Sequence, residues 1–135
     1  MTSIDSYLVP VLIENKAAYE KPARIYAQAL HECGAMCVVE CWLDQSGPEV
    51  TSCPGVEARM ESEIYRIFLK AAGACLGETV VLSFVEWSDK STRDAGMDKF
   101  TSDPRVQFND RSPTFGGRRL IADGFKPMLV MASES

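Results

Sequence analysis

The sequence contains none of the short motifs that mark the common nucleotide-binding and hydrolytic sites. It has no GxGxxG loop, no Walker A sequence, no HExxH helix and no GxSxG turn. Its single histidine, His31, leaves one possible base for a Ser-His-Asp triad. We therefore expect no cofactor. Because no catalytic motif is present, the sequence identifies no reaction and leaves open whether the protein is an enzyme.

Positive charge and long hydrophobic runs are also scarce. The chain has 14 Lys and Arg against 19 Asp and Glu, a formal net charge of −5, and no basic stripe interleaves with aromatic side chains. We therefore expect no nucleic-acid partner. Apolar runs such as Val80–Val85 are too short to span a bilayer, and no basic segment followed by an apolar stretch opens the chain. We expect no membrane partner and a cytoplasmic location.

The cysteines predict neither disulfides nor a metal site. An odd count without a secretory signal favours reduced thiols. His31 and Cys33 precede a helix end, whereas Cys37 and Cys41 lie ~13 Å apart along a predicted strand at ~3.3 Å per residue, too far to share one ion. We expect no metal and interpret the thiols as small buried side chains, with a nucleophilic Cys41 as the alternative. The cysteines are Cys33, Cys37, Cys41, Cys53 and Cys75.

What the sequence does contain is typical of one globular domain spanning residues 1–135. Hydrophobic residues make up 46% and charged residues 24% of the 135 residues, enough apolar content for a real core. Hydrophobic periodicity predicts the order strand, helix, strand, extra helix, strand, helix, strand. The ranges are 6–14, 15–33, 36–43, 57–72, 79–87, 91–102 and 120–131.

Two of these segments carry interruptions. Pro22 lies inside the first helical pattern, so either the helix kinks there or a separate turn over residues 15–20 precedes a helix that begins near Pro22; we favour the second. Gly34 is expected to stop this helix. The last strand is expected over Leu120, Ile121 and 125–131, in two pieces separated by Asp123-Gly124.

This order is the βαββαβ arrangement of the ferredoxin-like fold, of class α+β. Two helices would cover one face of a four-stranded sheet. Val, Leu, Phe and Trp residues on the central strands would make the second face apolar as well. A monomer would expose that face, so we expect a homodimer through the sheet face.

Several strings carry a resemblance to a known family. They are IDSYLV (4–9), VVECW (38–42), TVVLSFVEW (79–87), RDA (93–95), DPR (103–105) and GRRLIADGF (117–125). In this order they resemble the YbaA-like proteins, a bacterial family of unknown function in the dimeric α/β-barrel superfamily. The resemblance implies a ferredoxin-like protomer whose sheet pairs with a second copy to close a barrel. It implies no catalytic residues, and the segment 54–77 is longer than the usual connection.

The candidate ligand-pocket residues are carboxylates, tryptophans and arginines. Glu40 and Glu86 have apolar neighbours along their strands, so each is either one partner of an ion pair with arginine or a lone pocket carboxylate. Antiparallel pairing would place Glu40 opposite Leu82 and Glu86 opposite Met36, ~13 Å apart, too far for an acid–base dyad. Trp42 and Trp87 are interpreted as core or interface anchors, and Arg118 and Arg119 as ligands for an anion or as ion-pair partners. The full set is Glu40, Trp42, Glu86, Trp87, Arg118 and Arg119.

Two functions remain open. The first is a small-molecule-binding protein or cofactor-independent enzyme with a pocket between sheet and helices. Related barrels include heme-degrading, monooxygenase-type and isomerase-like members, which is an analogy of fold alone. The alternative is a non-catalytic dimeric interaction or stress-response module.

Overall fold

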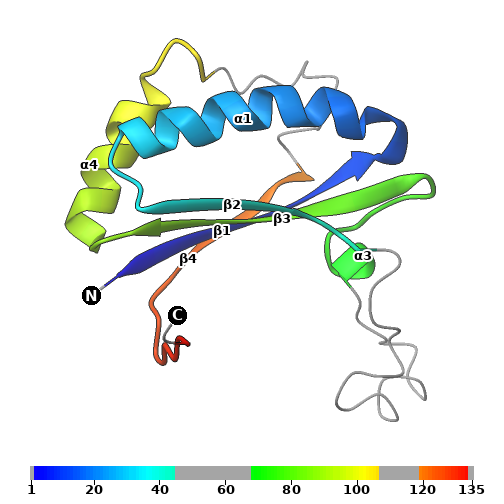
Figure 1. Cartoon of the computed structure of the whole chain (residues 1–135). Coiled ribbons are helices and arrows are strands. Elements are labelled where there is room, and N and C mark those ends of the chain that lie inside the picture. The colour runs from blue at the N-terminus through cyan, green and yellow to red at the C-terminus, as the bar shows by residue number, and fades with distance from the viewer. Residues whose placement is uncertain (1, 45–67, 107–118, 134–135) are drawn as a thin grey trace.

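The computed structural model describes residues 2–44, 68–106 and 119–133 of the chain. These residues form a four-stranded sheet with helices α1 and α4 on one of its faces, as Figure 1 shows. In chain order the elements are β1 (Ser3–Leu12), the 3-10 turn η1 (Ile13–Asn15), α1 (Lys16–Glu32), β2 (Cys37–Trp42), α3 (Phe68–Ala71), β3 (Glu78–Trp87), α4 (Lys90–Thr101) and β4 (Ile121–Phe125).

The strand order in the sheet is β2-β3-β1-β4, and all neighbouring strands are antiparallel. β1 and β3 pair along their whole length, from Ser3 opposite Trp87 to Leu12 opposite Glu78, so they form the centre of the sheet. Because α1 carries the chain across the sheet, β2 leaves a gap beside β1 that β3 then fills. The α+β, ferredoxin-like βαββαβ fold predicted from the sequence is confirmed.

Gly34 stops helix α1 as the sequence predicts, two positions after the last helical residue, Glu32. The Ala35 N–H donates to the Leu30 carbonyl at 3.0 Å, and the Gly34 N–H donates to the His31 carbonyl at 3.1 Å. This pair of bonds is a Schellman motif, which needs a left-handed residue, and Gly34 has a φ of +113°. The turn directs the chain back along α1 into β2.

The prediction of a separate turn before Pro22 is wrong, because α1 is continuous from Lys16 to Glu32 and contains Pro22. Proline has no N–H, so its bond to the carbonyl four residues earlier is missing. The helix persists because its apolar stripe packs on the sheet, with Tyr19, Ala23 and Leu30 buried. Here tertiary packing outweighs the local cost of proline.

The core between helices and sheet has two parts. One contains Trp87, Val85 and Phe100 with the C-terminal half of α1. The other contains Val9, Val11 and Val81 with Tyr19 and Ala23. Since strand side chains alternate, the odd-numbered positions of β1 and β3 face the helices and the even-numbered positions face the opposite side.

The last strand is shorter than expected. β4 runs from Ile121 to Phe125 as one piece that includes Asp123-Gly124, and residues 126–133 are not in a strand. Phe125 pairs with Ile4, and β1 begins at Ser3, so β1 offers no partner to residues beyond Lys126. The predicted continuation of the strand to residue 131 is therefore wrong.

The sheet face opposite α1 and α4, here called the open face, carries exposed apolar residues together with the polar residues Ser6, Glu86 and Asp123. Val39, Phe84, Ile121 and Phe125 keep 39–57% of their surface exposed there. α3 and residues 126–133 lie on this side, at different ends of the sheet (Figure 1). α3 lies within the range 57–72 predicted for the extra helix, and residues 57–67 of that prediction lie outside the described residues.

Candidate functional site

Glu40 lies in the middle of edge strand β2 and faces α1. Its Oε2 accepts hydrogen bonds from the Ser83 hydroxyl at 2.9 Å and the Tyr19 hydroxyl at 3.2 Å. Ser83 is the residue directly opposite Glu40 in β3, and Tyr19 comes from the first turn of α1. Three elements that are distant in sequence therefore meet at one carboxylate.

The observed pairing differs by one residue from the sequence-based expectation, which placed Leu82 opposite Glu40. Ser83 takes that position, and Cys37 rather than Met36 is opposite Glu86. A one-residue shift exchanges the two faces of a strand. The correct register gives Glu40 a hydroxyl partner, whereas the expected one would have given it an apolar residue.

Burial governs the ionisation of this group. Although Glu40 as a residue stays exposed at the sheet edge, burial of its carboxyl group raises its pKa, and the bonds from Ser83 and Tyr19 oppose that rise. Burial, followed by the charge of Glu40, raises the pKa of Tyr19 far above its usual value. Tyr19 therefore remains a protonated donor, and Glu40 is an acceptor for hydrogen bonds and protons.

An outer cavity of about 270 Å³ opens between α1 and β2 beside Glu40. Trp42 forms part of its wall, and the Trp42 indole Nε1 donates to Glu20 Oε1 at 3.0 Å. The Trp42 ring also meets the Tyr19 ring edge-on, with centroids 5.3 Å apart. Glu20 and Arg24 add charge to the lining, so this cavity is partly polar.

An inner cavity of about 190 Å³ lies deeper, between the sheet and both helices. Its lining is mainly apolar and aromatic. Tyr19, Ala23 and Glu40 line both cavities, so Glu40 lies where the two meet. Other residues around the inner cavity are Tyr7, Val9, Pro22, Tyr26, Leu30, Ser83, Val85, Met97, Phe100, Thr101 and Leu120.

The six residues predicted for a pocket are not all brought together. Glu40 and Trp42 line the outer cavity. Glu86 lies between Val85 and Trp87, both buried under the helices, so it points to the open face. Arg118 lies outside the described residues.

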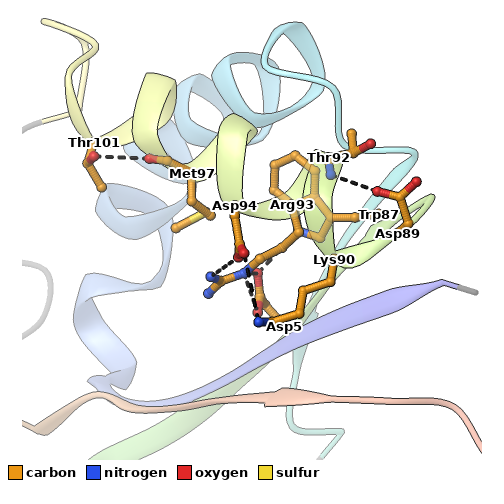
Figure 2. A network of polar contacts seen from close by, with 9 residues as sticks. All are labelled: Asp5, Trp87, Asp89, Lys90, Thr92, Arg93, Asp94, Met97 and Thr101. Carbon is orange, nitrogen blue, oxygen red and sulfur yellow. Dashed lines mark hydrogen bonds and ion pairs between the residues drawn. The ribbon is translucent and has the colours of Figure 1, made fainter.

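Trp87 is fully buried at the end of β3 and belongs to a polar network with residues of β1 and α4 (Figure 2). Its indole Nε1 donates to Asp5 Oδ2 at 3.1 Å. The Arg93 Nε of α4 donates to both Asp5 oxygens, at 3.0 and 3.2 Å, so the buried Asp5 charge is paired. Because this network leaves Asp5 satisfied and enclosed, its role is to hold α4 on the sheet.

Arg119 ties the segment before β4 to the turn before β3. Its guanidinium donates to both oxygens of Glu78, at 2.7 and 2.8 Å, and to the Gly73 carbonyl at 2.6 Å. This bidentate pairing lowers the pKa of Glu78 to about 2. Arg119 is thus already engaged with a carboxylate of its own chain.

Sequence reasoning missed three residues with polar roles. Tyr19, Ser83 and Asp5 were not among the residues predicted for a site. Asp5 carried a usable signal, since it shares the core-facing side of β1 with Tyr7 and Val9. Tyr19 and Ser83 carried none, because their roles depend on the strand register and on how α1 lies over β2.

In the described part of the chain, no helix has the length and apolar character to cross a membrane. Nor do the described histidine, cysteine and acidic side chains gather in groups of three or more that could hold a metal ion.

The fold and the carboxylate beside two cavities define a ferredoxin-like α+β protein with a hollow beneath its first helix. The family model described as "Protein of unknown function (DUF1428)" matches residues 2–117. The chain therefore belongs to the DUF1428 family. The resemblance to the YbaA-like proteins is confirmed.

Relatives cover almost the whole chain. "Uncharacterized protein YbaA" of Escherichia coli (strain K12) is 33% identical over 130 residues, which span 96% of this chain and 98% of that protein. YbaA of Shigella flexneri matches to the same extent. A solved structure of a dimeric ferredoxin-like protein from an uncultured marine organism is 12% identical with a TM-score of 0.44, over 98% of this chain and 100% of that chain.

Proposed function

We propose that this protein binds a small, largely apolar molecule in the hollow between the sheet and its helices, with Glu40 as the polar anchor. The observation that carries this proposal is the position of Glu40, which lines both cavities. Among the described residues, both hydrogen bonds to its carboxylate end on Oε2. We expect the donor group of the ligand to bond to the second oxygen, Oε1.

The lining determines the chemistry of the ligand. The inner cavity suits an apolar or aromatic body, because aromatic and aliphatic side chains dominate its wall. Glu40 suits an N–H or O–H donor on that body, because a carboxylate only accepts hydrogen bonds. The ligand is thus expected to have an apolar part and one donor group at its edge.

The two cavities beside the Glu40 carboxylate favour a ligand-binding protein over a purely structural module. A structural core would fill this space with side chains, as Trp87 does farther along β3. A carboxylate of raised pKa can also accept a proton from a bound molecule, so the same site is suited to general-base chemistry without a cofactor.

Ligand-observed NMR with small aromatic fragments tests the proposal. The set pairs indole with 1-methylindole and phenol with anisole, so that each pair differs by one donor. We expect the donor fragment to bind more tightly, and Glu40→Gln to weaken its binding by about fivefold through loss of a charge-assisted bond.

Glu86→Gln is the matched control, because it removes a carboxylate from the opposite face of the same sheet. It should leave fragment binding unchanged. The proposal is contradicted if no fragment binds at millimolar concentration, or if donors and their methylated counterparts bind equally to the wild-type protein.

We also propose that the partner of the open face is a second copy of the chain. Exposed apolar residues on a sheet face, such as Val39, Phe84 and Phe125, support this assembly. Two such faces can stack ≈ 10 Å apart in a symmetric dimer. Sedimentation of the purified chain is the test, and a strict monomer at micromolar concentration would exclude the dimer.

For location we propose the cytoplasm. The described cysteines Cys33, Cys37, Cys41 and Cys75 are free thiols, which supports a reducing compartment. Fractionation of cells that produce the protein would test this.

A further inference from the structure

We infer that residues 126–133, here called the C-terminal arm, pack against a second copy of the chain rather than against their own sheet. The inference rests on the proposed dimer and adds a specific contact to it. In a two-fold assembly each copy would give one arm and receive one.

The exposure of the arm is the first observation. Met128, Leu129, Val130 and Met131 expose 98%, 71%, 75% and 89% of their surface. Burial of each of these side chains lowers the free energy, and contiguous exposed apolar residues mark interaction sites. The arm is thus as apolar as a buried segment, yet its side chains are exposed.

The direction of the arm is the second observation. It leaves the sheet after β4 on the side opposite α1 and α4, which is the side of the open face (Figure 1). A second sheet stacked on the open face would lie ≈ 10 Å away, across the space into which the arm projects. Stacking would therefore bring the arm into contact with the second copy.

The sequence at the start of the arm keeps the chain extended beyond β4. Lys126 precedes Pro127, and a residue before proline is restricted to extended conformations. Among the described strands of its own chain the arm has none to pair with, because β1 begins at Ser3 and already pairs with β4 up to Phe125.

The open face offers the arm a matching surface. Phe84 and Val39 lie on neighbouring strands β3 and β2, where they form an exposed apolar strip directly across from each other. In a face-to-face dimer this strip lies at the β2 edge of the stacked sheets, where the arm of the other copy can pack beside it. We therefore assign the arm to an apolar contact that holds the two copies together.

Sedimentation equilibrium of three variants tests the arm. Leu129→Asp places a charge in the apolar part of the arm and should raise the dissociation constant of the dimer tenfold or more. Ser133→Asp adds the same charge at the polar end of the arm and should change it less than twofold. Phe84→Asp should disrupt the dimer through the open face itself.

A photocrosslink distinguishes the two possible locations of the arm. With p-benzoylphenylalanine in place of Met128, irradiation should give a covalent dimer on a denaturing gel, with the crosslinked peptide mapping to β2 or β3. Crosslinks confined to one chain would overturn the assignment. So would a dimer whose dissociation constant is unchanged in Leu129→Asp, although the dimer proposal would then survive. A wild-type chain that stays monomeric would overturn both.

Discussion

At the scale of single residues, Glu40 combines its proposed role as a ligand anchor with a cost to stability. Its carboxyl group is partly desolvated between α1 and β2, and the Ser83 and Tyr19 hydroxyls offset only part of that cost, so its pKa is raised. A carboxylate held in this way is typical of binding and catalytic sites, where function outweighs stability. Glu78 shows the opposite case, since its pKa of about 2 reflects a favourable ion pair with Arg119.

The raised pKa predicts how stability depends on pH. The folded chain holds the Glu40 proton more tightly than the unfolded chain does. Protonation of Glu40 therefore adds to the free energy of unfolding. This added stability is fully present below the usual pKa of 4.5 and is lost as the pH rises through the raised pKa of the folded chain. We therefore expect Glu40→Gln to be more stable than wild type at about pH 7 and nearly equal to it at about pH 4.

Urea denaturation at several pH values measures this difference, and Glu86→Gln serves as the control on the opposite face. A Glu40→Gln variant whose advantage grows toward acid pH would show that the pKa is lowered instead.

At the scale of elements, close packing of α4 on β3 depends on one glycine. Gly96 is buried against the Trp87 ring, and a Cβ there would overlap the ring, lying 2.7 Å from Trp87 Cη2 and 2.9 Å from the Cys33 carbonyl oxygen. The sequence prediction placed α4 within one residue at each end but assigned no role to Gly96. That role depends on a tryptophan in another element, so no local pattern reveals it.

Gly96→Ala is expected to destabilise the protein by about 1–3 kcal/mol, even though alanine is the better helix former, because the added methyl group overpacks the core. Chemical denaturation monitored by Trp fluorescence measures the change. Ala95→Gly is the matched control at an exposed position of the same helix, where the ordinary preference for alanine should hold at a cost of about 0.5–1 kcal/mol. A neutral or stabilising Gly96→Ala would show that α4 can move away from Trp87.

At the scale of the whole molecule, a single copy of the chain leaves apolar surface of its sheet uncovered. One sheet face is covered by α1 and α4, whereas the open face keeps residues such as Phe84 exposed. The C-terminal arm adds further exposed apolar surface on the same side. A second copy would bury both surfaces in one assembly.

A dimer makes thermal stability depend on concentration, because only the folded chain associates. We expect the Tm of the wild-type protein to rise by several degrees between about 1 and about 100 µM, and the Tm of Phe84→Asp to stay constant. Differential scanning calorimetry over this range measures it. A wild-type Tm that is independent of concentration would argue against association through the open face.

The order of elements, the ferredoxin-like topology and the Gly34 helix stop follow from the sequence alone, because hydrophobic periodicity, helix capping and chain handedness are local rules. Only the tertiary structure decided the rest. The register that brings Ser83 to Glu40, the continuity of α1 through Pro22, and the Asp5–Trp87–Arg93 network depend on side chains that meet across the fold. Asp5 and Trp87, for example, are 82 positions apart. Pairing over such distances is selected by the packing of all elements together, and no single segment encodes it.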